Sequence, residues 1–221
     1  MGLTLGCELA TLRPCKERDD MGKVRQPQQD RSIKTRAAIM DAAFALFAEK
    51  GIHGTNSKEI VKKAGVSIGS FYAYFKNKKT LLLEMLEDYL DRHYTAIWEE
   101  VSAAPPAQWG EDEVRSLVRH VFKAYDISPE FHRQTHALRY SDPDINEVYE
   151  RDRERQVAQL ESLIIAFKDV LNIKDARASA LIIHNSVENA AHTAKFIGHR
   201  IEEERLINAL TNMIYEFIKP R

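Results

Sequence analysis

The residues with the clearest chemical potential lie in the run S-I-G-S-F-Y-A-Y-F-K-N-K, residues 67–78. Tyr72, Tyr74 and Lys78 carry hydroxyl and ammonium groups of the kind that bind phosphate oxygens. Beside them stand residues whose side chains are small or uncharged, namely Ile68, Gly69, Ser70 and Ala73. This combination predicts a surface that lets the backbone approach a nucleic acid closely, with phosphate contacts on either side.

The four aromatic residues of this run have two possible uses. Phe71 and Phe75 are one helical turn apart, so we expect both to anchor the segment in a hydrophobic core. Tyr72 and Tyr74 could also be core residues. Their hydroxyl groups need polar partners, however, and this favours phosphate contact.

The segments around this run read as two short helices joined by a tight turn. Asn56 and Glu59 have the N-x-x-E spacing of a capping box, which predicts that a helix begins there. Gly65 suits the left-handed conformation that ends a helix, and Ser67 is a good N-cap for a second helix that extends to Phe75. The pattern is typical of a helix-turn-helix, whose second helix enters the major groove of DNA.

A longer helix is expected before this pair, from Ser32 to the Lys50-Gly51 stop. Apolar residues follow one another in it at steps of four, three, four and three, and they are Ile33, Ala37, Met40, Phe44 and Phe47. Because this spacing matches the period of a helix, we expect these five residues to form its buried face.

Charge divides the chain into two parts. The whole sequence of 221 residues has a formal net charge of −1, but residues 21–80 hold 12 Lys and Arg against 4 Asp and Glu. Residues 81–221 hold 17 against 25. A basic segment joined to an acidic one is the pattern expected where only the first part contacts an anionic partner such as DNA.

Glycine is absent between Gly110 and Gly198, so a strand-rich fold with many tight turns is not expected. Caps and prolines predict further helices at about residues 78–102, 111–125, 143–171, 175–196 and 201–218, and another that begins at Pro129. We therefore expect an all-α protein of about nine helices. Its predicted parts are a disordered extension (residues 1–30), a three-helix head with the helix-turn-helix (31–80), and a larger helical domain for ligand binding and dimerisation (81–221).

The run T-N-S-K-E-I-V-K-K-A-G-V-S-I-G-S-F-Y-A-Y-F-K-N-K-K-T-L-L resembles the signature of the TetR family of bacterial transcriptional regulators. The resemblance covers about residues 32–85. It implies that Thr55, Tyr72, Tyr74 and Lys78 hold the DNA backbone, and that Ser67 begins the recognition helix. The residues it places toward the bases are Lys58, Ile68, Gly69, Ser70 and Ala73. Ile68, Gly69 and Ala73 cannot form bidentate hydrogen bonds, so direct base readout would fall on Ser70, Lys58 and apolar contacts with thymine methyl groups.

The acidic part carries two further patterns. The last expected helix has Leu206, Leu210, Met213 and Phe217 on one stripe and more isoleucines on the next, and the helix before it is rich in alanine. These two helix faces could form a four-helix interface between two copies of the chain, or they could pack in an ordinary core within one chain. The dimer interface is favoured.

Polar residues of the penultimate helix could serve a ligand. His184, Glu188, His192 and Lys195 share a stripe, and the alternatives are a hydrogen-bonded network, contact with a ligand, or a metal site. His132 and His136 also stand one turn apart and could chelate a metal, but a surface or pocket-lining role is favoured. The aromatic residues that could line an apolar cavity or simply fill the core are Phe122, Tyr125, Phe131 and Tyr140, with Trp98 and Trp109 as further candidates. We take Phe122, Tyr125, Tyr140, His184 and Glu188 as the predicted ligand-binding residues.

No catalytic constellation, cofactor motif or apolar run long enough for a membrane span is found in the sequence. Cys7 and Cys15 indicate neither a disulfide framework nor a metal site. The sequence therefore predicts a non-enzymatic, cytoplasmic homodimer without a cofactor or membrane partner, which represses transcription from a palindromic operator in double-stranded DNA and is released by a small-molecule effector. The alternative is an activator or a chromosome-organising protein without a small ligand.

Overall fold

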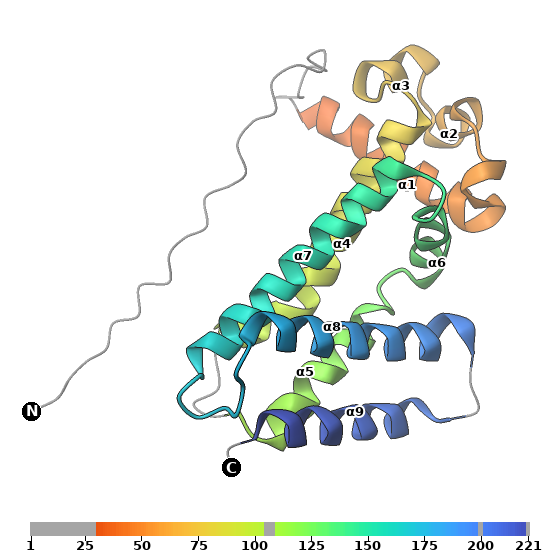
Figure 1. Cartoon of the computed structure of the whole chain (residues 1–221). Helices are drawn as coiled ribbons and strands as arrows, with labels where there is room; N and C mark the ends of the chain where they lie inside the picture. The colour runs from red at the N-terminus through yellow and green to blue at the C-terminus, as the bar shows by residue number, and fades with distance from the viewer. Residues whose placement is uncertain (1–29, 104–108, 199–200, 220–221) are drawn as a thin grey trace, which may run out of the picture.

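The computed structural model describes residues 30–103, 109–198 and 201–219, and these residues form nine α-helices and no strand (Figure 1). The prediction of an all-α protein is therefore confirmed. The predicted extension, with both cysteines, lies outside the described residues except for Asp30. In chain order the helices are α1 (Asp30–Gly54), α2 (Ser57–Ala64), α3 (Ile68–Tyr74), α4 (Lys78–Ala103), α5 (Glu111–Ala124), α6 (Pro129–Leu138), α7 (Pro143–Ala166), α8 (Ala176–His192) and α9 (Glu203–Ile218), with a π turn at Thr193–Ile197.

The turns of the head form as the sequence predicts. The Glu59 N–H donates to the Asn56 side chain at 3.1 Å, and the Glu59 carboxylate accepts from the Asn56 N–H at 3.2 Å, which completes the capping box. Gly65 has φ 67° and ends α2, and the Ser67 hydroxyl caps α3 by accepting from the Ser70 N–H at 3.0 Å. These local bonds fix the angle between α2 and α3.

The buried face of α1 differs from the predicted one. The residues that pack inward are Ile39, Ala42, Ala43, Leu46 and Phe47. Of the predicted stripe, Ile33 is 57% exposed, Ala37 is exposed and Met40 is half-buried. Phe44 is 36% exposed and contacts Phe131 of α6, with the ring centroids 5.5 Å apart. Phe47 is buried as predicted, and Met40 packs against the hydrophobic core of the head. The prediction is wrong for Ile33, Ala37 and Phe44, because α1 carries two neighbouring apolar stripes and periodicity alone does not decide which of them meets α2 and α3.

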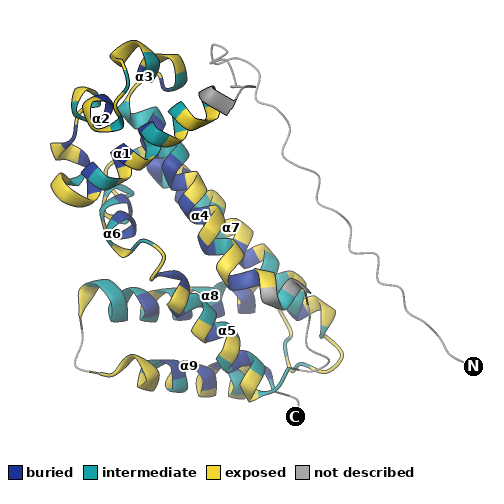
Figure 2. Cartoon of the chain, turned by 180° about the vertical axis from the view of Figure 1, so that it is seen from behind, coloured by how far each residue is buried: buried dark blue, intermediate teal, exposed yellow. Residues whose placement is uncertain are grey.

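Helices α4 and α7 run side by side and connect the head to a lower body in which α8 and α9 cross beneath them (Figures 1 and 2). One hydrophobic core joins the head to the start of α7, where Ile145, Val148 and Tyr149 are buried with Phe71 and Phe75. A second core fills the body between α4, α5, α7, α8 and α9. The head therefore shares its core with the upper body.

Helix α7 ends at Ala166 rather than near Leu171 as predicted. Beyond it the chain turns so that Leu171 and Ile173 pack against the second core, and the Asn172 N–H donates to the Ile218 carbonyl at 3.0 Å. A continued helix could not make these contacts.

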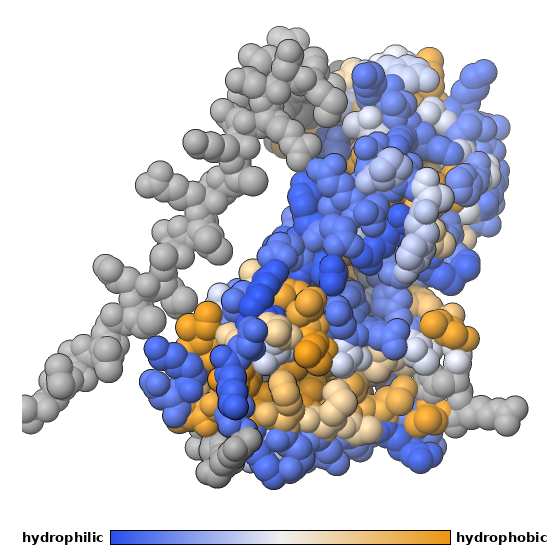
Figure 3. Space-filling model, viewed as in Figure 1, coloured by the Kyte–Doolittle hydropathy of each residue, from blue (hydrophilic) through white to orange (hydrophobic). Residues whose placement is uncertain are grey.

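Polar and apolar side chains are distributed differently over the head and the body. In the view of Figure 1, hydrophobic side chains gather over the lower part, where α8 and α9 lie, while the upper part is mostly hydrophilic (Figure 3). Among the described residues, no helix is long and apolar enough to cross a bilayer.

Candidate DNA-binding and ligand-binding sites

The outer face of α3 presents the side chains that the sequence singles out. Ser67, Gly69 and Ala73 are exposed, Ile68 is 42% exposed and Tyr72 is 56% exposed. Ser70 is half-buried and Lys58 of α2 is exposed as well. Phe71 and Phe75 lie on the opposite face, fully buried, as predicted. The outer end of α3 is yellow in Figure 2, which marks this exposed edge. The head thus holds a short helix rigidly by its aromatic face and leaves its other face free.

Tyr74 occupies a different position from Tyr72. Its hydroxyl lies 2.7 Å from the Ser32 hydroxyl, and its ring packs against the first core. Tyr74 therefore ties the start of α1 to the end of α3, and Tyr72 is the better placed of the two for a phosphate contact.

Lys78 and Thr55 hold the loop between α1 and α2. The Lys78 ammonium donates to the carbonyls of Ile52 at 2.7 Å and Thr55 at 2.6 Å, and partial burial lowers its pKa. An ammonium group has three N–H donors, so one is left for a phosphate. The Thr55 side chain is only 2% exposed and its hydroxyl donates to the Gly51 carbonyl at 2.9 Å. In this structure the Thr55 hydroxyl bonds to the main chain of the α1 end, so Thr55 positions the loop, and its contact with DNA stays a prediction.

Thr55→Val is expected to lower the free energy of unfolding by about 1–2 kcal/mol, because the isosteric valine leaves buried carbonyl oxygens without their donor. Urea denaturation measures this effect. Thr95→Val is the matched control, because the Thr95 hydroxyl bonds only to the Asp91 carbonyl of its own helix and is exposed. We expect the control to change stability by less than about 0.5 kcal/mol. Equal effects of the two substitutions would contradict the positioning role.

Helix α6 connects the body to the end of α1 through Gln134. Its side-chain amide donates to the Phe47 carbonyl at 3.0 Å and accepts from the Ile52 N–H at 2.8 Å. These bonds bridge the point at which Gly51, with φ 78°, breaks the helix. Sequence reasoning missed Gln134, and no local pattern marks it, because both partners lie more than 80 residues away.

The body encloses a cavity of about 90 Å³ between α4, α5, α7, α8 and α9. This is several times the space that one water molecule needs. Most of the lining side chains are aliphatic. The polar and aromatic lining residues are His93, Trp98, Trp109, Tyr125, Gln156, His184 and Glu188.

Three of the five predicted ligand-binding residues, Tyr125, His184 and Glu188, line this cavity. Phe122 does not: it is buried in the second core. Tyr140 also does not, because it follows the end of α6, is 82% exposed and contacts only the outer side of His136 among the ring pairs. His93 was missed, although a lone histidine on the apolar stripe formed by Leu86, Tyr89, Leu90 and Ile97 could have drawn attention to it.

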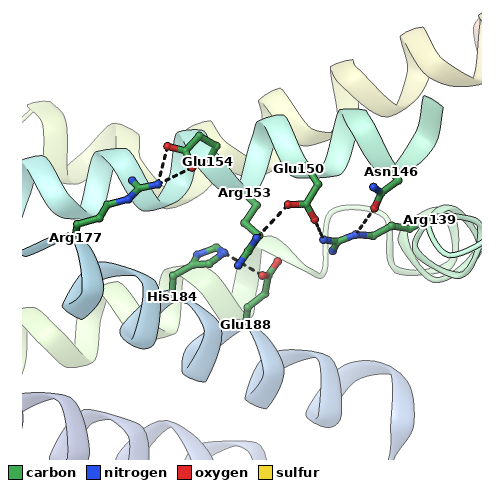
Figure 4. A network of polar contacts seen from close by, with 8 residues as sticks. All are labelled: Arg139, Asn146, Glu150, Arg153, Glu154, Arg177, His184 and Glu188. Carbon is green, nitrogen blue, oxygen red and sulfur yellow. Dashed lines mark hydrogen bonds and ion pairs between the residues drawn. The ribbon is translucent and has the colours of Figure 1, made fainter. Parts of the chain in front are cut away.

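Glu188 lines the cavity next to His184 and forms part of a network of polar contacts (Figure 4). One of its carboxylate oxygens is 3.0 Å from His184 Nε2, and the other accepts a hydrogen bond from the Tyr125 hydroxyl at 3.1 Å. Burial alone would raise the pKa of Glu188, but the contact with His184, the nearby His192 and the Tyr125 hydroxyl outweigh it and hold the pKa at about 2. The carboxylate is therefore ionised at neutral pH.

Buried histidines lie beside this carboxylate. His132 of α6 and His192 of α8 face each other with their Nε2 atoms 3.0 Å apart, and His136 stacks on His132. Burial lowers the pKa of His93 to about 4 and that of His132 to about 2, so both imidazoles are neutral near pH 7. Among the described residues no group of three or more His, Cys, Asp or Glu side chains is arranged to hold a metal ion.

Stability is expected to fall when the solution is acidified from pH 7 to pH 5.5. Because the pKa values of His93 and His132 are lower in the folded than in the unfolded chain, the unfolded chain binds more protons in this range. Asp152, whose pKa burial raises to about 6, acts in the opposite direction. His136, whose pKa burial also lowers to about 4, adds to the fall, so the balance is a loss of about 3 kcal/mol, measurable by urea denaturation at each pH. His132→Gln should roughly halve the loss; a pH-independent stability would refute the neutral histidine pair.

The head and its exposed α3 define a helix-turn-helix protein with a helical body. The model of the bacterial regulatory proteins of the tetR family matches residues 39–85. The uncharacterized HTH-type transcriptional regulator YuxN of Bacillus subtilis is 46% identical over 59 residues, which is 27% of this chain and 20% of that protein. The HTH-type transcriptional repressor KstR2 of Rhodococcus jostii is 31% identical over 104 residues, 46% of this chain and 50% of that protein.

The alignments thus span half or less of these curated relatives. Similarity of fold extends further: a putative TetR-family regulator from Mesorhizobium loti superposes with a TM-score of 0.73 at 21% identity, over 86% of this chain and all of the other. Residues 39–85 of this chain are therefore similar to the bacterial regulatory proteins of the tetR family, and the described residues share the fold of the Mesorhizobium loti regulator.

Proposed function

We propose that the protein is a DNA-binding transcriptional regulator, a homodimeric repressor that binds a palindromic operator through α3 and is released by a small-molecule effector. The observation that carries this proposal is the exposed face of α3 held on a buried aromatic base. Its activity is binding, without a catalytic step, and it would act on DNA in the cytoplasm.

DNA contact is supported by the charge and exposure of the head. Lys58 and Tyr72 are both exposed, and Lys78 keeps a third N–H donor beside the loop between α1 and α2. We assign Tyr72 and Lys78 to the phosphates, and Lys58, Ser70 and the exposed residues of α3 to the bases. This division agrees with the general rule that phosphate contacts position a protein and base contacts specify the sequence.

Dimerisation is supported by apolar side chains left exposed on α8 and α9. One face of α9 packs into the second core through Ile207, Leu210, Ile214 and Ile218. Ile182 of α8 remains 58% exposed, and Met213 and Phe217 of α9 remain about half exposed. An apolar surface over two adjacent helices is suited to the two-fold packing of a second copy (Figure 3).

Release by an effector is supported by the contacts between the cavity and the head. Tyr125 lines the cavity and packs against His132 of α6, with the ring centroids 5.0 Å apart. Two residues further along α6, Gln134 holds the end of α1. A ligand that changes the position of α6 would therefore change the angle of the head, and its effect is limited by its differential affinity for the two states.

The experiment that tests repression is a promoter fusion to the region upstream of the gene, compared in cells with the gene present, deleted and restored. Repression predicts that deletion raises expression and that restoration lowers it again. A fall in expression when the gene is deleted would instead show an activator. Unchanged expression would exclude regulation of that promoter.

A further inference from the structure

The wall of the cavity selects an apolar ligand. Aliphatic side chains from five helices form most of it, among them Ile97, Val114, Leu117, Leu160, Ile164 and Ile218. None of the described residues that line it is Lys, Arg or Asp. A ligand that fills this space must therefore bury hydrocarbon along most of its length.

Glu188 is the single carboxylate of the described lining, and it has unused hydrogen-bonding capacity. An ionised carboxylate offers about four acceptor positions. Tyr125 and His184 occupy two of them. The remaining positions call for a donor, and a positively charged donor makes the strongest bond.

His93 is a further polar residue of the lining, and Trp109 Nε1 is another buried lining atom without a hydrogen-bond partner among the described residues. Both ring nitrogens of His93 are buried and have no hydrogen-bond partner, and the side chain is only 6% exposed. His93 lies on α4 and lines the same cavity as Glu188. A neutral imidazole offers one acceptor, so a ligand group that donates several hydrogen bonds could satisfy Glu188 and His93 together.

Among the described residues that line the cavity, His184 is the one group within ion-pair distance of Glu188, and the lining contains no Lys or Arg. Arg139, at the end of α6, and Arg153 of α7 border Glu188 in a smaller neighbouring pocket, where both pair with Glu150 (Figure 4). Asp152 of α7 is buried with one oxygen unbonded and adds no positive charge. His184 and His192 of α8 and Tyr125 of α5 complete the surroundings. An anionic ligand would meet the Glu188 carboxylate here with no lining Lys or Arg to pair with.

We propose that the effector is an apolar molecule with one protonated amine, whose ammonium group binds Glu188 and His93 while its hydrocarbon part fills the cavity. The inference rests on the proposed ligand-released regulator and names the chemical class of its ligand. It distinguishes this protein from one that responds to a fatty acid, in which the polar end carries the opposite charge.

Both tryptophans of the chain, Trp98 and Trp109, line the cavity, so intrinsic fluorescence reports ligand entry directly. The test titrates the full-length protein at pH 8 with three probes of equal length, decylamine, 1-decanol and decanoate, below their micellar concentrations. We expect decylammonium to bind on the order of 10- to 100-fold more tightly than decanoate, with decanol between them. Equal or tighter binding of decanoate, or no binding of the amine up to about 1 mM, would overturn the inference.

The variant Glu188→Gln tests whether this carboxylate causes the preference for decylamine over decanoate. In this variant the affinity for decylamine should exceed the affinity for decanoate by about threefold or less, because the side chain loses its charge and keeps its shape. Glu202→Gln is the matched control, since Glu202 is exposed at the start of α9 outside the cavity, and it should retain the full ratio. An unchanged ratio in folded Glu188→Gln, checked by its circular dichroism, would overturn the inference. If the variant does not fold, the three-probe series on the unmodified protein still decides between an amine and a carboxylate ligand.

These titrations contain no DNA, so they fail or succeed independently of the proposed repressor function. Amine binding that leaves DNA affinity unchanged would support the ligand class and refute ligand release. DNA binding that responds to decanoate but not to the amine would refute the ligand class and support release.

Discussion

Ala73→Glu is expected to lower the affinity for specific DNA by about 100-fold or more while the head stays folded. Ala73 is exposed on the outer face of α3, so a glutamate side chain meets no core atom there. In the proposed complex its carboxylate would lie against the phosphates and base edges, where a negative charge is repelled and left without a partner. Fluorescence anisotropy with labelled duplex DNA measures the affinity, and thermal unfolding checks the fold.

Ala48→Glu provides the matched control for Ala73→Glu. Ala48 is an equally exposed alanine of the head, but it lies at the end of α1 that faces Glu130 and Arg133 of α6. We expect its DNA affinity to stay within about threefold of the original, since surface substitutions away from an interface have small effects. If the two variants lost affinity equally, the charge of the head and not the face of α3 would be responsible.

The double variant Ile182→Glu with Phe217→Glu is expected to convert the proposed dimer into monomers. These side chains are about half exposed on α8 and α9, and two buried carboxylates on each copy would face one another across a two-fold interface. Sedimentation velocity should then report the mass of one chain, 25.4 kDa, instead of twice that value. Affinity for a palindromic site should fall by about 100-fold or more, because each head would bind its half-site alone.

Val170→Glu separates a specific interface from a general effect of added charge. Val170 is 52% exposed in the turn after α7 and does not belong to α8 or α9. This variant should remain dimeric. A dimer in the double variant, or a monomer in the control, would place the interface elsewhere.

The features that the sequence predicted well depend on neighbours along the chain. The capping box at Asn56, the left-handed Gly65 and the Ser67 cap all act within three or four residues, so their residue types reveal them. Phe71 and Phe75 were assigned to the core correctly because their spacing places both on one face of a short helix.

The features that were missed depend on contacts between distant segments. The buried position of Thr55 follows from how α1 packs on the loop, and the side of α1 that faces inward depends on α2 and α3. Gln134 bonds to a residue 82 positions away, for which no local pattern exists. His93 is the exception, because a histidine within an apolar stripe is visible in the sequence, although its two unpaired nitrogens appear only in the structure.

The most direct test of the central claim is the selection of DNA from a random duplex library by the purified protein, followed by sequencing. The account predicts enrichment of a palindrome whose half-sites lie about one helical turn apart, roughly 34 to 36 Å between recognition helices. Ser70→Ala should alter the enriched bases, and Ala73→Glu should enrich nothing. Failure of the unmodified protein to enrich any sequence, or enrichment that persists in Ala73→Glu, would contradict the assignment of α3 as the element that reads DNA.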